Sequence, residues 1–380
     1  MKKVILVGSA HPFRGGLAVF NERLIREFQN LGYKAEIYTF TIQYPGFLFP
    51  GKTQFSDSPS PDDLKISRLV NSVNPLNWIK IGNRIRKEKP EILIFKFWLP
   101  FMGPCFGTIA RIAKRNNKTK IACILDNVIP HESRPGDKQL TAYFLKPVDA
   151  FIAMSDSVLK DLDFFDKAKP RKISPHPLFD NFGAAISKNE ACARLGISDE
   201  YNYLLFFGFI RDYKGLDLLL NAFSDSRMKD KKLKLIVAGE FYSDKTPYLQ
   251  LIEELGIKNQ VILKTDFIPD EKVVDYFCAS DLVVQPYKHA TQSGVTQIAY
   301  HFEKPMIVTN VGGLPELVPD GKVGFVVPVD PRAISDAIIQ FFDGDYQQKF
   351  SHGIQVEKQK FTWDKMVRNI EAVISEISSK

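Results

Sequence analysis

Short apolar runs of β type alternate with segments of helical periodicity along the whole chain. A first helical segment, residues 20–31, places Phe20, Leu24, Ile25 and Phe28 on one face. Alternation of fully apolar runs with helix-length segments is typical of parallel sheets whose strands are joined by crossover helices. We therefore predict a doubly wound α/β domain, with strands at residues 4–7, 35–40, 92–97, 121–125 and 150–154.

The same alternation restarts after a crossover segment that contains Pro175, Pro177 and a short helix ending at Gly196. Proline and glycine at these places are typical of a break in regular structure. A chain of 380 residues is also too long for one ordinary core. We predict an α/β protein with two Rossmann-like domains that face each other across a cleft. The second sheet has its strands at residues 204–207, 233–237, 261–264, 282–284, 306–308 and 325–327.

Residues 41–75 are predicted to form a long loop rich in aromatic residues, proline and glycine. Long loops in compact domains usually serve a function or are disordered. The apolar side chains of this loop indicate contact with an acceptor or a membrane surface, and simple packing is the alternative. The residues concerned are Tyr44, Phe47, Leu48, Phe49 and Lys52.

Composition and charge narrow the class of protein. Apolar residues make up 44% and charged residues 25%, which are globular values. The net charge of +7 fits nucleotides, polyanionic acceptors or a lipid surface as partners, and equally a protein that is merely basic. We expect no nucleic acid partner.

The cysteines and the apolar runs indicate the compartment. Cys105, Cys123, Cys192 and Cys278 are widely spaced, so we expect neither a disulfide framework nor a zinc site. No apolar run approaches the ~20 residues of a membrane span, and the first run is too short for a signal segment. We expect a cytoplasmic protein, neither integral nor exported by that route.

The loops that follow the strands carry the candidate chemistry, because open α/β sheets bind ligands at the carboxyl ends of their strands. Gly15 and Gly16 precede a helix and allow close approach of a phosphate or sugar, although a glycine pair also has a purely geometric explanation. Asp126 and His131 follow the fourth strand. A histidine there is either structural or an acid–base group.

The residues of two loops in the second half of the chain are suited to binding an anion. Arg211 and Lys214 lie between a strand and a helix, where their charges suit a diphosphate, with a solvated basic turn as the alternative. Ser293 and Gly294 lie in a similar strand–loop–helix arrangement within residues 281–316, which points amide groups at an anion. The Asp161–Asp163 pair has the spacing of a metal motif but the context of a solvated helix face.

These motifs resemble a known family in combination. GFIRDYKGLDLLLNAF, IVAGEFY and KPMIVTNVGGLPELV are similar to the donor domain of family 4 (group 1) glycosyltransferases, which have the GT-B fold. GSAHPFRGGLAVFNERL and DNVIPHE resemble the acceptor domain of the same family, so the resemblance covers nearly the whole chain. It implies transfer of a sugar from a nucleotide diphosphate sugar with retention of configuration and without a bound metal.

The resemblance also implies residue roles. Arg211 and Lys214 take the place of the family's basic pair on the diphosphate, although Phe209 stands where the family places its arginine. The family has two glutamates, one near the donor sugar and one on the ribose, and their positions are held by His289 and Gln297, which can still contact the sugar and a ribose hydroxyl. Asp126 stands where a histidine is common, so that histidine is either replaced or its role moves to His131. We expect chemistry from Asp126, His131, Arg211 and Lys214, and donor binding by Gly15, Gly16, Gly208, Glu240, His289, Ser293, Gly294, Val295 and Gln297.

The resulting hypothesis is a bacterial retaining glycosyltransferase. We expect an acceptor domain (1–178), a donor domain (179–358) and a C-terminal helix (359–380), and one possibility is that this helix packs on the acceptor domain. The protein's expected partners are a nucleotide sugar and a glycan or lipid-linked acceptor, and no cofactor is expected. Peripheral contact with the inner membrane face is a further option. The alternatives are a nucleotide-sugar-binding protein with impaired catalysis and a GT-B sugar-nucleotide epimerase. A periplasmic binding protein is disfavoured.

Overall fold

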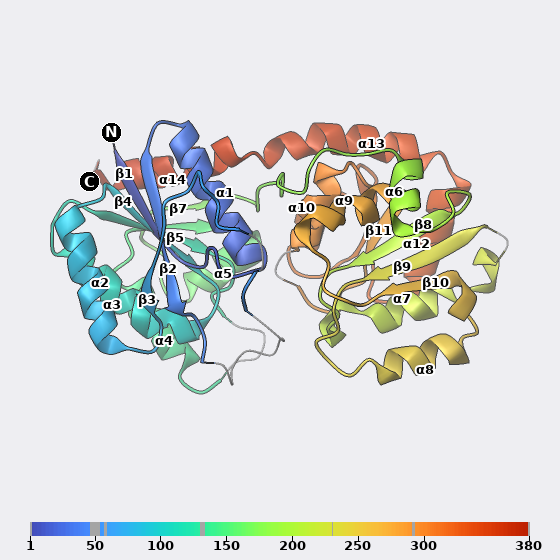
Figure 1. Ribbon diagram of the computed structural model, residues 1–380, viewed down its shortest axis with the longest axis horizontal. Helices are drawn as coiled ribbons and strands as arrows, with labels where there is room; N and C mark the ends of the chain where they lie inside the picture. Colours follow the sequence, from blue (N-terminus) through green and yellow to red (C-terminus); the bar gives the residue numbers. More distant parts are fainter. Residues whose placement is uncertain are drawn as a thin grey trace. The chain divides into compact units, whose positions relative to one another are not determined.

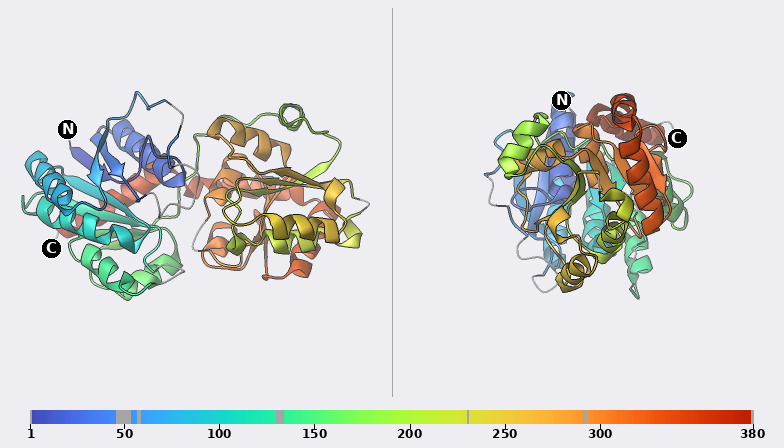
Figure 2. Two further views of the ribbon diagram at one scale, coloured as in Figure 1. Left: turned by 60° about the horizontal axis from the view of Figure 1, so that its bottom comes forward. Right: turned by 90° about the vertical axis from the view of Figure 1, so that its right-hand side faces the viewer.

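A computed structural model describes residues 2–45, 54–56, 59–129, 134–229, 231–290 and 293–378. The chain divides into two compact units, one of residues 1–175 with 362–380 and one of residues 176–361. Each unit contains one parallel sheet covered by helices (Figures 1 and 2). The predicted α/β class with two Rossmann-like sheets is confirmed.

The sheet of the first unit has seven strands in the order β3-β2-β1-β4-β5-β6-β7, all paired in parallel. Side chains alternate between its two faces, so that Ile5 and Val7 belong to one core cluster while Val4 and Leu6 belong to the other. The strands are β1 (Lys3–Val7), β2 (Lys34–Ile42), β3 (Ile66–Asn71), β4 (Ile92–Phe97), β5 (Lys120–Leu125), β6 (Ala150–Ala153) and β7 (Arg171–Ile173).

Two edge strands of this sheet were not predicted. β3 lies in the segment expected to be a loop, and only Val70 in it is buried. β7 has three residues and none of them is buried. An edge strand is covered on fewer sides than a central one, so neither segment carries the apolar run on which the prediction depended.

The helices of the first unit form two layers. Helices α1 (Gly16–Asn30) and α14 (Trp363–Ser378) cover one face of the sheet, where the rings of Phe20 and Trp363 lie 5.1 Å apart. The C-terminal helix therefore belongs to the first unit. The other face is covered by α2 (Pro75–Glu88), α3 (Gly103–Lys114), α4 (Asp137–Leu145) and α5 (Asp156–Asp163).

The second unit has a six-stranded parallel sheet in the order β10-β9-β8-β11-β12-β13. All six predicted runs are strands, namely β8 (Asn202–Phe207), β9 (Leu233–Ala238), β10 (Val261–Lys264), β11 (Leu282–Gln285), β12 (Met306–Thr309) and β13 (Gly324–Val327). The helices are α6 (Lys188–Leu195), α7 (Leu216–Phe223), α8 (Thr246–Glu254), α9 (Asp270–Ala279), α10 (Gly294–His301), α11 (Leu314–Leu317), α12 (Pro331–Asp343) and α13 (Tyr346–Glu357).

Candidate functional site

The loops after β8 and β9 are held together by backbone contacts. The amide of Ile210 donates to the carbonyl of Glu240 at 2.8 Å, and the amide of Tyr242 donates to the carbonyl of Ile210 at 3.0 Å. Gly208 has a φ of 95°, and a Cβ on Gly239 would lie 2.2 Å from the carbonyl oxygen of Gly208. Glycine is therefore required at both strand ends.

Lys214 packs against Gly208. It ends a 3₁₀ turn, Asp212–Lys214, and its Nζ would be 3.0 Å from a Cβ on Gly208. The ammonium group also lies 5.6 Å from the ring centroid of Tyr287. Within the described part of the chain it has no hydrogen-bond acceptor and no carboxylate partner. Burial, with a smaller effect from Arg211, lowers the pKa of Lys214 to about 8.

Arg211 is exposed, and aromatic side chains support it. Its guanidinium carbon lies 5.0 Å from the ring centroid of Tyr242, whose ring lies 4.4 Å from that of Phe209. Phe209 occupies the place where the family was expected to have an arginine. The aromatic stack therefore supports a guanidinium that comes two residues after that position.

The first turn of α10 converges on the same place. A methyl carbon of Val295 would lie 3.7 Å from a Cβ on Gly208. The hydroxyl of Ser293 lies 3.2 Å from that of Tyr287 and does not cap α10. The first amides of α10 are thus not capped by a side chain. The absence of a Cβ at Gly294 leaves room for the ring of Phe179, which an added Cβ would approach to 3.0 Å. A helix N-terminus and a cation at one place suit an anion.

Other predicted donor residues are placed differently. Gln297 is completely buried in α10, and neither of its amide atoms has a hydrogen-bond partner among the residues described. The ribose contact predicted for Gln297 is not supported by this position, because no part of the side chain reaches solvent. His289 is exposed in the loop after β11, and Glu240 is partly buried after β9.

In the first unit, Asp126 is part of a buried ion pair that the sequence analysis missed. Its Oδ1 lies 2.9 Å from Nζ of Lys96, which also lies 3.3 Å from the ring centroid of Phe20. Burial lowers the pKa of Lys96, while Asp126 opposes that shift. A signal was present, since Lys96 is the one charged residue in the strand ILIFKF.

The remaining predictions for the first unit concern loops. Gly15 has a φ of 103° and precedes α1, where Gly15 and Gly16 are both exposed and no side chain caps the helix. His131 lies outside the described residues, as do Phe47, Leu48, Phe49 and Lys52. Tyr44 is partly buried and accepts a hydrogen bond from the indole of Trp98 at 2.6 Å.

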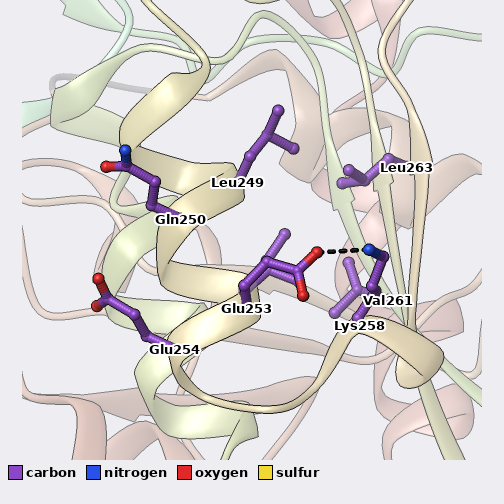
Figure 3. A pocket seen from close by; sticks show the side chains of 8 residues that line it. Leu249, Gln250, Glu253, Glu254, Lys258, Val261 and Leu263 are labelled. Atoms are coloured by element: carbon purple, nitrogen blue, oxygen red, sulfur yellow. Dashed lines mark ion pairs between the residues drawn. The ribbon is translucent and has the colours of Figure 1, made fainter.

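A surface depression of about 840 Å³ lies elsewhere in the second unit, between α8 and the edge strand β10 (Figure 3). Figure 3 shows Leu249 and Leu263 on opposite sides of it, with an ion pair between Glu253 and Lys258. None of the predicted site residues lines it, so it is not the predicted donor site. In the described part of the chain, no group of acidic, histidine and cysteine side chains could hold a metal.

Comparison with solved structures identifies the fold. Two parallel-sheet Rossmann-like units are the architecture of GT-B glycosyltransferases. The chain is similar to sucrose-phosphate synthase from Thermosynechococcus elongatus, with a TM-score of 0.71, 15% identity and coverage of 100% of this chain and 98% of that one. A structure of Anabaena HepE in complex with UDP gives a TM-score of 0.71 at 17% identity, covering 100% of both chains.

Residues 187–355 match the sequence model of the family described as glycosyl transferases group 1. The match lies within the second unit, which is thus similar to this family, in agreement with the donor-domain motifs. An uncharacterized glycosyltransferase from Methanocaldococcus jannaschii is 24% identical over 391 residues, covering 99% of each chain. A D-inositol 3-phosphate glycosyltransferase from Corynebacterium diphtheriae is 28% identical over 210 residues, which span 53% of this chain and 49% of that protein.

Proposed function

We propose that the protein is a retaining glycosyltransferase that moves a hexosyl group from a nucleotide diphosphate sugar to a glycan or a lipid-linked acceptor. The observation that carries this proposal is the position of Lys214. Its ammonium group is partly buried against Gly208, beside the first turn of α10, without a counter-ion among the described residues. A cation kept unpaired in this way is suited to an anionic ligand.

Positive groups at this place would stabilise the leaving group of the transfer reaction. When the bond to the sugar breaks, negative charge develops on the nucleoside diphosphate that leaves. Lys214, Arg211 and the first amides of α10 would stabilise this charge electrostatically. Because they supply positive charge at this place, we propose that transfer requires neither a metal nor another cofactor.

Residues of the first unit would act on the acceptor side. Lys96 holds the Asp126 carboxylate in one orientation at the carboxyl end of β5. Asp126 would accept a hydrogen bond from the reacting hydroxyl or stabilise positive charge on the sugar ring, and His131 would share this role. At the start of α1, an added Cβ on Gly15 would have no atom within 4 Å, so Gly15, with the exposed Gly16 after it, would leave room for a sugar or phosphate.

The test measures sugar transfer by the wild type and by Lys214→Met, with uridine, guanosine and adenosine diphosphate sugars and lipid and glycan extracts. We expect the variant to lose at least ~100-fold in kcat/KM, since it removes a charge that stabilises the leaving group. Lys322→Met, at an exposed lysine of the same unit, is the matched control. Unchanged activity of Lys214→Met would refute the role of Lys214, and an inverted product anomer would refute retention.

A second candidate is a nucleotide-sugar-binding protein without turnover. The burial of Gln297 favours it, because neither His289 nor Gln297 supplies a carboxylate and Gln297 does not reach the surface. Calorimetry that finds tight donor binding, together with no turnover on any acceptor, would support this candidate. Hydrolysis or epimerisation of the nucleotide sugar alone would instead support the epimerase.

For location, we propose a bacterial cytoplasmic enzyme of polysaccharide biosynthesis that contacts the inner membrane face peripherally. None of the described helices is long and apolar enough to cross a membrane.

A further inference from the structure

The solvent-facing side of α2, in the first unit (Figure 1), begins with exposed apolar side chains. Leu76 is 77% exposed, the highest value for a large apolar side chain in the part of the chain described. Ile79 is 45% exposed and Val73, just before the helix, 44%. Ile42 is 41% exposed, and its carbonyl accepts the amide of Ser72 at 3.0 Å. We call Ile42, Val73, Leu76 and Ile79 the apolar tip.

The rest of this helix face is cationic. Leu76, Lys80 and Lys87 follow at spacings of four and seven residues and therefore share a face, and both lysines are exposed. Residues 66–87 contain no aspartate or glutamate. The first acidic residue, Glu88, is paired with Lys3 and Arg84. Glu88 therefore neutralises Lys3 and Arg84, whereas Lys80 and Lys87 take part in no ion pair among the described residues.

The exposure of the apolar tip is fixed by the fold. The side chain of Asn74 caps α2 by accepting the amides of Leu76 and Asn77 at 3.0 and 3.3 Å. The indole of Trp78 donates to the carbonyl of Asn71 at 2.7 Å, and the opposite face of the helix is buried in the core. The helix start is therefore held firmly while its apolar side chains face water, which has a cost in free energy.

We propose that the apolar tip, with Lys80 and Lys87, is a docking surface for a bilayer that contains anionic lipids. Apolar residues and lysines on one helix face are the composition of helices that lie in the membrane interface. The apolar side chains would enter the acyl boundary while the lysines contact lipid phosphates. Protein interfaces are depleted in lysine, which argues against a protein partner. The inference rests on the proposed peripheral location and names the surface responsible for it.

The test is co-sedimentation of the full chain with phosphatidylcholine vesicles that contain or lack phosphatidylglycerol. We expect the wild type to bind only the anionic vesicles, and high salt to release it. Leu76→Ser/Ile79→Ser should lower the partition coefficient on the order of tenfold or more, because less apolar surface is buried. Lys80→Glu/Lys87→Glu should lower it by a similar factor and reduce its salt dependence.

Matched controls lie in the second unit. Val356→Ser removes an apolar side chain that is 54% exposed, and Lys322→Glu/Lys349→Glu reverses two exposed lysines. Both should bind anionic vesicles like the wild type. Equal loss in the lysine control would show that net charge alone is responsible, which would overturn the proposal. A wild type that binds neither vesicle would also overturn it and leave a protein as the occupant of this surface.

Binding of nucleoside diphosphates separates this inference from the proposed function. The α2 variants should retain the wild-type affinity and cooperative unfolding, because their substitutions lie on the surface of the other unit. Vesicle binding by a wild type that transfers no sugar would support the docking surface and contradict the proposed activity. If the wild type transfers sugar and Leu76→Ser/Ile79→Ser binds vesicles as well as the wild type does, the proposed activity would be supported and the docking surface contradicted.

Discussion

The ammonium nitrogen of Lys214 lies so close to Gly208 that a Cβ on this glycine would be 3.0 Å from it. Gly208 also has a φ of 95°, which disfavours any other residue. The glycine is therefore required twice, once by the backbone at the end of β8 and once by the lysine that packs on it. Its substitution should affect the anion site directly.

We predict that Gly208→Ala weakens binding of nucleoside diphosphates on the order of tenfold, because the new methyl group displaces Lys214. Strain at the positive φ should also lower the free energy of unfolding by about 1 kcal/mol. Calorimetry measures the binding and urea denaturation the stability. Gly196→Ala is the matched control, since Gly196 has a φ of 68° but no atom within 4 Å of an added Cβ. It should lose stability and retain affinity.

Binding of the diphosphate should depend on pH through Lys214. Its pKa in the free protein is about 8, so the affinity should fall as pH rises through that value and the ammonium is lost. In Lys214→Met this change should be absent, as calorimetry from pH 6.5 to 9.5 can establish. An unaltered pH profile in the variant would exclude Lys214 as its source.

The same lysine has the opposite effect on stability. Folding lowers the pKa of Lys214 from 10.5 to about 8, so between these values the unfolded chain binds more protons than the folded one. The contribution of Lys214 to the free energy of unfolding therefore rises with pH across that window. Lys214→Met should lack this rise in urea denaturation without nucleotide.

The fold could be predicted well because central strands of a parallel sheet are buried on both faces. Each such strand is a nearly continuous apolar run, as in β8 and β11, and each was found. Strands at the edges lack that signal, which is why β3 and β7 were missed. The helix α2 was also absent from the prediction, since its solvent face carries Leu76 and Ile79 and obscures the amphipathic pattern.

The candidate site could be predicted only where chain order determines position. Lys214 and Gly294 each follow a strand of one sheet, and parallel strands end at the same edge, so their proximity to Gly208 was foreseeable. Burial was not foreseeable from spacing. Gln297 was expected to meet a ribose, yet the fold buries it, and Lys96 was overlooked although it pairs with Asp126.

Tyr242 should act as a positioning residue for Arg211. Its ring carries the guanidinium at 5.0 Å, so Tyr242→Ala should raise the donor KM about threefold with little change in kcat. Tyr242→Phe, which keeps the ring, should restore the wild-type KM. Tyr201→Ala is the control, because it removes a similar contact, between Lys234 and Tyr201, at 4.3 Å. An increase in KM in this control would show a general loss of packing instead.

The buried pair of Lys96 and Asp126 should be costly to break. Lys96→Met should lower the free energy of unfolding by about 3 kcal/mol, because it leaves a buried carboxylate without its cation. Lys96→Met/Asp126→Leu should recover most of this loss and still lack transfer activity. Lys2→Met breaks an exposed pair with Glu91 and should cost less than about 1 kcal/mol. Urea denaturation followed by circular dichroism measures all three.

Gln297 provides the sharpest test of the donor site. A buried amide without hydrogen-bond partners lowers stability, so Gln297→Leu should raise the free energy of unfolding by about 1 kcal/mol. Because the side chain does not reach solvent, affinity for nucleoside diphosphates should be unchanged. Gln285→Leu is a suitable contrast, since its amide bonds to Thr296 at 3.1 Å and its loss should destabilise the unit. If Gln297→Leu instead lost affinity while Gln285→Leu kept it, the ribose contact first predicted for Gln297 would be supported.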